Sequence, residues 1–141
     1  MTHIPSHLPE ILNRNISGYH QYCLSGNARP IFISENLCGM INLPQSAIFD
    51  ELEDRYAQRV HPSDRDSYQL FLEQLRCQPQ TQTAQYRLIR GDGSILFVCD
   101  TMTSYLQGTQ MLADSVLTDI TQIKAENQNL QRHHRKLQNL C

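Results

Sequence analysis

The chain has 141 residues, with 12 Lys and Arg against 14 Asp and Glu, which gives a net charge of -2 and a pI near 6.3. This length fits one domain with short extensions, and the charge balance leaves no excess of cations to neutralise nucleic-acid phosphates or anionic lipid. No apolar run approaches the ~20 residues that span a bilayer, and the N-terminus lacks a secretory pattern, so we expect a cytoplasmic protein that binds neither nucleic acid nor membrane.

The first third of the chain predicts a helix, two strands and several helical turns. Apolar residues at helical spacing predict an N-terminal amphipathic helix within residues 1–16. Short strands are expected at 19–24 and 31–33, because turn residues lie between them. The stretch 36–54 mixes Gly, Pro and scattered apolar residues, which favours several short helical turns over one element.

A longer helix is predicted next, because Pro62 suits a first helical turn and Asp64 adds negative charge at the positive end of the helix dipole. Pro79 is expected to end it. Its apolar residues recur on one face of the helix: Tyr68, Phe71, Leu72 and Leu75.

The second half predicts three antiparallel strands, at 86–90, 94–106 and 111–118. Asp92-Gly93 between the first two is the strongest turn signal, since this pair supplies the positive φ angles of a tight hairpin. The whole pattern predicts an α+β fold, a five-stranded antiparallel sheet with short helices covering one face, and no parallel nucleotide-binding sheet.

The last segment, 122–141, is rich in polar residues and predicts a weak coiled coil. Heptad positions a and d would be taken by Ile120, Ile123, Asn127, Leu130, His134 and Leu137. Asn at an a position favours two parallel strands at a cost in stability, so a parallel homodimer with modest pairing strength is predicted. A solvated helix whose apolar stripe folds back on its own sheet remains the alternative.

Three blocks in this order resemble a subfamily of PAS domains from bacterial signalling proteins: 61–65 (HPSDR), 85–95 (QYRLIRGDGSI) and 119–121 (DIT). The segment 32–37 resembles the second PAS strand and the turn after it. The resemblance spans 17–121, and it implies a sensor domain with a PAS-like sheet and a C-terminal signalling helix. Phe97 stands near a position where this subfamily often has Trp.

The resemblance implies that Asp119 and Thr121 pass conformational change to the terminal helix. Asp119 and Gln122 also have the spacing of a capping box, in which Asp119 accepts from the first turn and Gln122 reaches back. The end of the chain resembles the approach to a diguanylate cyclase domain, so the segment is expected to lead to such an effector. A histidine kinase is the close alternative.

Ligands and cofactors are less well defined by the sequence. A small apolar ligand is conceivable between the sheet and the helices, although the same residues can simply fill the core: Phe71, Tyr86, Leu88, Phe97 and Val116. No cofactor is predicted. The longer helix lacks a His for haem, the segment around Cys38 lacks the residues of a flavin photosensor, and no metal-ligand spacing stands out.

Enzymatic motifs such as a nucleophile elbow, a P-loop or a dinucleotide fingerprint are missing from the sequence. The carboxylates of Glu51, Glu53 and Asp54 read as solvated surface. The visible chain is therefore predicted to be a regulatory module and not an enzyme. Two alternatives remain open: a small stand-alone α+β enzyme, and a constitutive dimerisation adaptor without a ligand.

Overall fold

The computed structural model describes residues 17–139, and side chains through residue 132. The strands are β1 (Ser17–Cys23), β2 (Arg29–Ile33), β3 (Thr81–Ile89), β4 (Ile95–Gln107) and β5 (Gln110–Asp119). The helices are α2 (Glu35–Ile41), α3 (Gln45–Ile48), α4 (Arg55–Gln58), α5 (Arg65–Cys77) and α6 (Thr121–Asn139), with a 3₁₀ turn over Pro62–Asp64. The helix expected within residues 1–16 lies outside the described residues.

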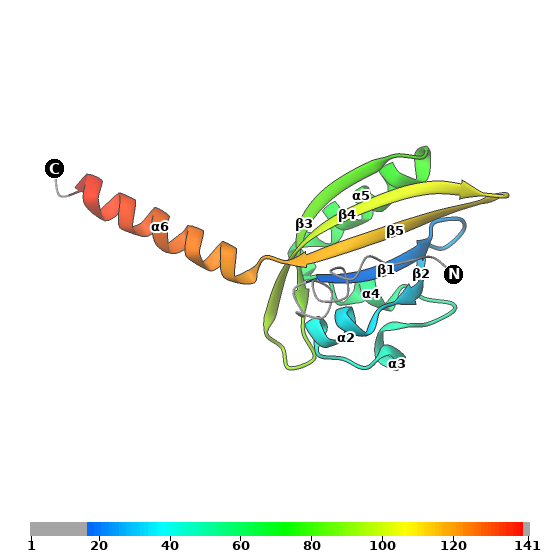
Figure 1. The fold of residues 1–141 in the computed structure, drawn as a ribbon, viewed down its shortest axis with the longest axis horizontal. Coiled ribbons are helices and arrows are strands. Elements are labelled where there is room, and N and C mark those ends of the chain that lie inside the picture. The colour runs from blue at the N-terminus through cyan, green and yellow to red at the C-terminus, as the bar shows by residue number, and fades with distance from the viewer. Residues whose placement is uncertain (1–16, 140–141) are drawn as a thin grey trace, which may run out of the picture.

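The five strands form one antiparallel sheet in the order β2-β1-β5-β4-β3. The opening hairpin and the later meander are both as predicted, and β1 joins them by pairing with β5. Figure 1 shows α2 to α5 gathered on one face of the sheet, while α6 projects away from the domain. The predicted α+β architecture is confirmed.

Strand β3 begins earlier than predicted, at Thr81 instead of Tyr86. The Gln- and Thr-rich stretch pairs with the middle of the long strand β4, where Thr81 lies opposite Thr103. The two hydroxyl oxygens are 2.8 Å apart, a cross-strand hydrogen bond between β-branched residues that suit an exposed sheet surface. Polar composition was therefore a poor guide to where this strand starts.

The turn between β3 and β4 differs in detail from the predicted hairpin. Only Gly93 has a positive φ, 89°, while Asp92 does not. The carboxylate of Asp92 instead accepts a hydrogen bond from the backbone N–H of Ser94, at 3.0 Å. The Asp92 side chain thus stabilises a connection longer than a two-residue turn. A hydrogen bond from Arg90 N to Ser94 O, at 2.8 Å, closes this connection.

The core lies between the sheet and α2 to α5. The predicted apolar face of α5 is confirmed, because Tyr68, Phe71, Leu72 and Leu75 are all 5% exposed or less. On the sheet side it meets inward residues of β3 and β4 such as Leu88, Leu96 and Val98, which are completely buried. Burial of this kind contributes roughly 1.5–3 kcal/mol per large apolar side chain.

Candidate functional site

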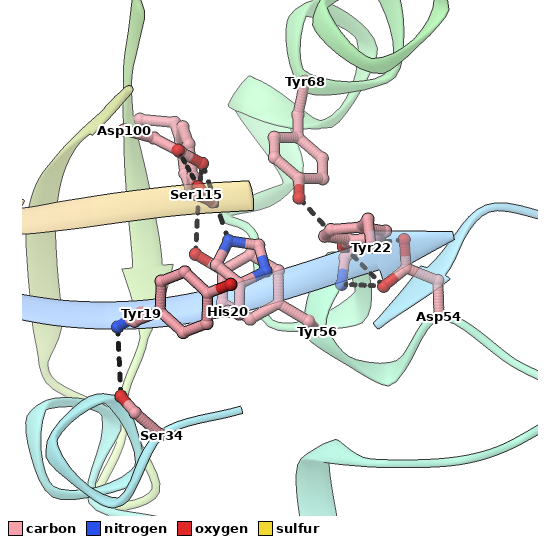
Figure 2. Close-up of polar contacts among 11 residues, drawn as sticks. Tyr19, His20, Tyr22, Ser34, Asp54, Tyr56, Tyr68, Asp100 and Ser115 are labelled. Atoms are coloured by element: carbon pink, nitrogen blue, oxygen red, sulfur yellow. Dashed lines mark hydrogen bonds and ion pairs between the residues drawn. The ribbon is translucent and has the colours of Figure 1, made fainter. Parts of the chain in front are cut away.

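The core contains a set of buried polar side chains, which we call the core polar cluster. Its members come from both halves of the domain and meet between the sheet and the helices: His20, Tyr22, Asp54, Tyr56, Tyr68, Tyr86, Asp100 and Ser115. Figure 2 labels all of them except Tyr86. Five of them are completely buried although they carry polar or ionisable groups: His20, Tyr22, Tyr56, Asp100 and Ser115. Such groups are costly to bury unless they have partners.

One chain of hydrogen bonds links Asp54, Tyr22 and Tyr68. The hydroxyl of Tyr22 lies 2.8 and 2.9 Å from the two carboxylate oxygens of Asp54, and it accepts a hydrogen bond from the hydroxyl of Tyr68 at 2.9 Å. Asp54 also caps α4, because its Oδ1 accepts from the backbone N–H of Ala57 at 2.9 Å. The chain therefore ties β1 to α4 and α5.

A second chain runs through Tyr56, Tyr86, Asp100 and Ser115. The hydroxyls of Tyr56 and Tyr86 are 2.6 Å apart, and Tyr86 donates to Asp100 Oδ2 at 2.7 Å. Ser115 donates to the other carboxylate oxygen, Oδ1. Asp100 on β4 is thus held from both neighbouring strands, by Tyr86 on β3 and Ser115 on β5.

His20 lies between the two chains (Figure 2). Its ring stacks on Tyr56, with ring centroids 4.5 Å apart, and meets the edge of Tyr22 at 5.1 Å. Its Nε2 is 3.8 Å from Asp100 Oδ2, which is too long for a hydrogen bond. Neither ring nitrogen has a hydrogen-bond partner among the described residues. His20 is therefore the unsatisfied member of an otherwise bonded cluster.

Burial controls the acid–base properties of the cluster. It raises the pKa of Tyr22, Tyr56, Tyr68 and Tyr86 well above the ordinary value of 10, so these hydroxyls keep their protons. Burial also raises the pKa of Asp54 from 3.8 to about 6, against the opposing effect of its hydrogen bonds from Ala57 and Tyr22. Asp54 therefore changes charge much nearer neutrality than an ordinary aspartate.

A surface cleft of about 540 Å³ opens beside this cluster. Nine residues line it, most of them with polar side chains whose apolar parts also face the cleft: Asn27, Leu52, Glu53, Asp54, Ala57, Gln58, Arg65, Tyr68 and Gln69. Asp54 and Tyr68 belong to both the cleft and the cluster, so the cleft is the side from which solvent reaches the buried groups. The expectation that Asp54 lies in a solvated charge run is wrong, because its carboxylate is bonded inside the domain.

The five residues expected around a ligand do not lie together. Phe71, Tyr86 and Leu88 are in the core, but Phe97 and Val116 point to the opposite face of the sheet, where Val116 is 49% exposed. Successive side chains of a strand alternate between faces, and the inward phase of β4 contains Asp100 instead of Phe97. The inner surface is also more polar than the small apolar ligand we considered would require.

The junction between the sheet and α6 is closely hydrogen-bonded. Ile120 N donates to Phe97 O at 2.9 Å, and Phe97 N donates to the hydroxyl of Thr121 at 3.0 Å. Asp119 Oδ1 accepts from Thr121 N at 2.9 Å, and its Oδ2 lies 4.0 Å from Arg90 Nη2. The last strand and the helix are therefore both fastened to β4.

The predicted capping box is only half formed. Asp119 accepts from the first turn as expected, but the side-chain amide of Gln122 donates forward to Glu126 at 3.2 Å. Gln122 is exposed, so a bond with the next turn of the helix replaces the expected bond back to Asp119. The hydroxyl of Thr121, which bonds to β4, does more to anchor the helix than Gln122 does.

The HPSDR block joins α5 to β3. Asp64 forms a bidentate pair with Arg87, with distances of 2.8 and 2.9 Å, and it also accepts from Arg87 N. The hydrogen bond from Arg87 holds the pKa of Asp64 below its ordinary value. Backbone N–H of His61 donates to Arg87 O at 2.8 Å. These contacts are structural, since every one of them fastens neighbouring elements.

In the part of the chain that the structure describes, no helix is both long and apolar enough to cross a membrane. Within the same residues, no three His, Cys, Asp or Glu side chains come close enough together to bind a metal ion.

Comparison with known proteins identifies the fold. No protein-family model matches the chain, and no curated protein matches it. Among solved structures, it is similar to a sensory box histidine kinase/response regulator from Burkholderia thailandensis, with a TM-score of 0.69, 14% identity, and coverage of 95% of this chain and 99% of the other.

Two further structures agree. One is the N-terminal domain of a diguanylate cyclase with a PAS/PAC sensor from Marinobacter aquaeolei, with a TM-score of 0.64, 16% identity and coverage of 77% of this chain and 98% of the other. The other is a domain of a putative light and redox sensing histidine kinase from Haloarcula marismortui, with a TM-score of 0.62, 11% identity and coverage of 83% of this chain and 100% of the other. At these identities the likeness establishes the fold: the chain has the α+β architecture of a PAS domain.

The junction contacts can be tested with Thr121→Val. The valine keeps the side-chain shape but leaves Phe97 N–H without its acceptor, so we expect a loss of about 1 kcal/mol and roughly fivefold faster hydrogen exchange at Phe97. Thr118→Val is the matched control, because Thr118 is exposed on β5. Equal protection of the Phe97 amide in both variants would show that Thr121 does not anchor the helix.

Proposed function

We propose that this chain is a cytoplasmic regulatory PAS module that passes a signal through α6 to an effector domain. The observation that carries the proposal is the junction at Phe97, Asp119 and Thr121. A change in the register or twist of β4 and β5 would move the first turn of α6 directly, because backbone and side-chain hydrogen bonds join them. A helix attached in this way can transmit a small displacement over its whole length.

We also propose that α6 pairs with the same helix of a second copy in a parallel homodimer. Ile123 and Leu130 support this, since they are 54% and 66% exposed on a helix that projects from the domain. Asn127 lies at the intervening a position. Ile120 is only 9% exposed, so the seam would begin at Ile123. The side chains of His134 and Leu137 lie outside the described part of the helix.

The dimer proposal is tested by sedimentation equilibrium. Leu130→Asp places a charge in the proposed seam, so we expect the dimer dissociation constant to rise at least about tenfold. Ala125→Asp adds the same charge at the f position, which faces away from the seam, and it should leave the constant nearly unchanged. A wild-type chain that sediments as a monomer at high concentration, or equal behaviour of the two variants, would refute the pairing.

We propose a diguanylate cyclase as the effector, with a histidine kinase as the competitor. The end of the sequence resembles the approach to a cyclase domain, and one similar structure comes from such a protein. The similar histidine kinase structures support the competitor equally in fold. Formation of cyclic di-GMP from GTP by the full-length protein, against autophosphorylation with ATP, separates the two.

A stand-alone enzyme is the second candidate, because Asp54 has a raised pKa and lines a cleft. Both oxygens of Asp54 are engaged by the hydroxyl of Tyr22, and one also caps α4. A carboxylate bonded in this way suits a structural or regulatory role better than attack on a substrate. We therefore place the regulatory module first.

A further inference from the structure

His20 packs against the rings of Tyr22 and Tyr56 and faces the carboxylate of Asp100. Asp100 Oδ2 lies 3.8 Å from its Nε2, and Asp54 is close enough for a positive charge on His20 to lower the pKa of Asp54. The titratable groups that face it are Tyr22 from its own strand β1, Tyr56 from α4, Asp100 from β4 and, by its charge, Asp54 at the start of α4. Tyr68 on α5 and Tyr86 on β3 belong to the same cluster through their hydrogen bonds to Tyr22 and Asp100.

Three members of this set are an imidazole or a carboxylate: His20, Asp54 and Asp100. Burial keeps the four tyrosine hydroxyls protonated, and Ser115 does not titrate. Histidine is the side chain that ordinarily changes charge between about pH 5 and 8. The cluster therefore combines one imidazole with two carboxylates in a region where each charge acts strongly on the others.

Solvent reaches this group at Asp54. The cleft of about 540 Å³ includes Asp54 and Tyr68 in its lining, whereas His20 and Asp100 are fully buried. Protons can therefore enter and leave at the carboxylate of Asp54. The inner part of the cluster is isolated from water, so its charge must be balanced from within.

We propose that His20, Asp54 and Asp100 form a proton-binding site in the core, filled from the cleft, in which protonated His20 draws Asp100 into a direct hydrogen bond. A hydronium ion at the cleft transfers its proton to a carboxylate oxygen of Asp54 and becomes water. Once the proton rests on a ring nitrogen of His20, Asp54 is again a carboxylate. No electrons are exchanged, and the net change is one added proton.

The consequence is mechanical. For Nε2–H of His20 to donate to Asp100, the present 3.8 Å gap must close to about 2.8 Å. Asp100 is bonded to Tyr86 on β3 and Ser115 on β5, so its movement is shared by both neighbouring strands. Strand β5 leads directly into Asp119 and α6. Proton binding in the core is thus connected to α6 through the hydrogen bonds of Asp100 and through strand β5. This proton site is an addition to the signal relay proposed above.

The test is nuclear magnetic resonance of the wild-type chain between about pH 5 and 8. We expect the ring ¹⁵N shifts of His20 to report proton uptake, and the backbone amides of Asp100 and Ser115 to change with the same midpoint. Asp54→Asn removes the adjacent negative charge that favours the imidazolium, so it should lower that midpoint by roughly half to one pH unit. Glu51→Gln, the matched control at an exposed carboxylate outside the cleft lining, should leave it in place.

Three results would overturn the proposal. They are a His20 ring that stays in one protonation state over the range, amides of Asp100 and Ser115 that do not follow it, or equal midpoints in the two variants. If Asp54→Asn does not fold, the wild-type carboxyl ¹³C shifts of Asp54 and Asp100 decide the question, because both must respond at the midpoint of His20. Sedimentation measures pairing through α6 separately, so failure of the proton site and failure of the dimer are distinguishable.

Discussion

Replacing Tyr22 with Phe is expected to lower the free energy of unfolding by about 3 kcal/mol near pH 7.5. The ring remains and only the hydroxyl is lost, so packing is preserved. Asp54 then loses its side-chain hydrogen-bond donor at 2.8 and 2.9 Å and keeps only the backbone N–H of Ala57, and Tyr68 loses the acceptor of its buried hydroxyl at 2.9 Å. Urea unfolding followed by circular dichroism measures the difference.

The matched control is Tyr19→Phe on the outer face of the same strand. The hydroxyl of Tyr19 also donates to a carboxylate, that of Asp114 at 3.0 Å, but the site is only partly buried and solvent can replace the bond. We expect a loss below about 1 kcal/mol. The cost of Tyr22→Phe should also shrink below about pH 6, where Asp54 becomes neutral. Equal losses in the two variants would mean that the buried hydrogen bonds of Tyr22 stabilise the fold no more than the partly exposed bond of Tyr19.

The strongly periodic parts of this fold were readable from the sequence. The apolar face of α5 repeats at helical spacing, and the later strands are separated by clear turn signals, so local patterns were sufficient. The sequence was a poor guide to the phase of β4 and β5, that is, to which of their side chains face the core. The apolar character of Phe97 and Val116 predicts that they face inward, whereas the alternation through Leu96, Val98 and Met102 places Asp100 there. Strand phase was the better guide.

The core polar cluster could not have been predicted in the same way. Asp54 follows Glu51 and Glu53, and such a run is usually surface. Its burial depends on Tyr22, which reaches it from β1 across the fold. His20 meets Asp100 only because β1 pairs with β5 and β5 pairs with β4. Contacts of this type depend on which strands pair in the sheet, so local residue spacing in the sequence does not predict them.

The free energy of unfolding should depend on pH in the way that the raised pKa of Asp54 dictates. Its pKa is raised from 3.8 to about 6 in the folded chain, so the folded state binds the proton more tightly than the unfolded state. Stability from this group therefore falls as pH rises from about 4 to about 6 and stays low above that. A shift of this size corresponds to roughly 2–3 kcal/mol after allowance for partial exposure.

Other carboxylates act in the opposite direction, so the comparison must be made with a variant. Asp64 has a lowered pKa because of Arg87, and its contribution is lost as pH falls. Asp54→Asn removes only the term from Asp54. The difference in unfolding free energy between wild type and this variant should therefore change by roughly 2–3 kcal/mol between pH 4 and 7, in favour of the variant at the higher pH. Glu51→Gln, at an exposed residue outside the cleft lining, should give a flat difference. A flat difference for Asp54→Asn as well would mean that the carboxylate is solvated, and it would remove the route by which protons enter the core.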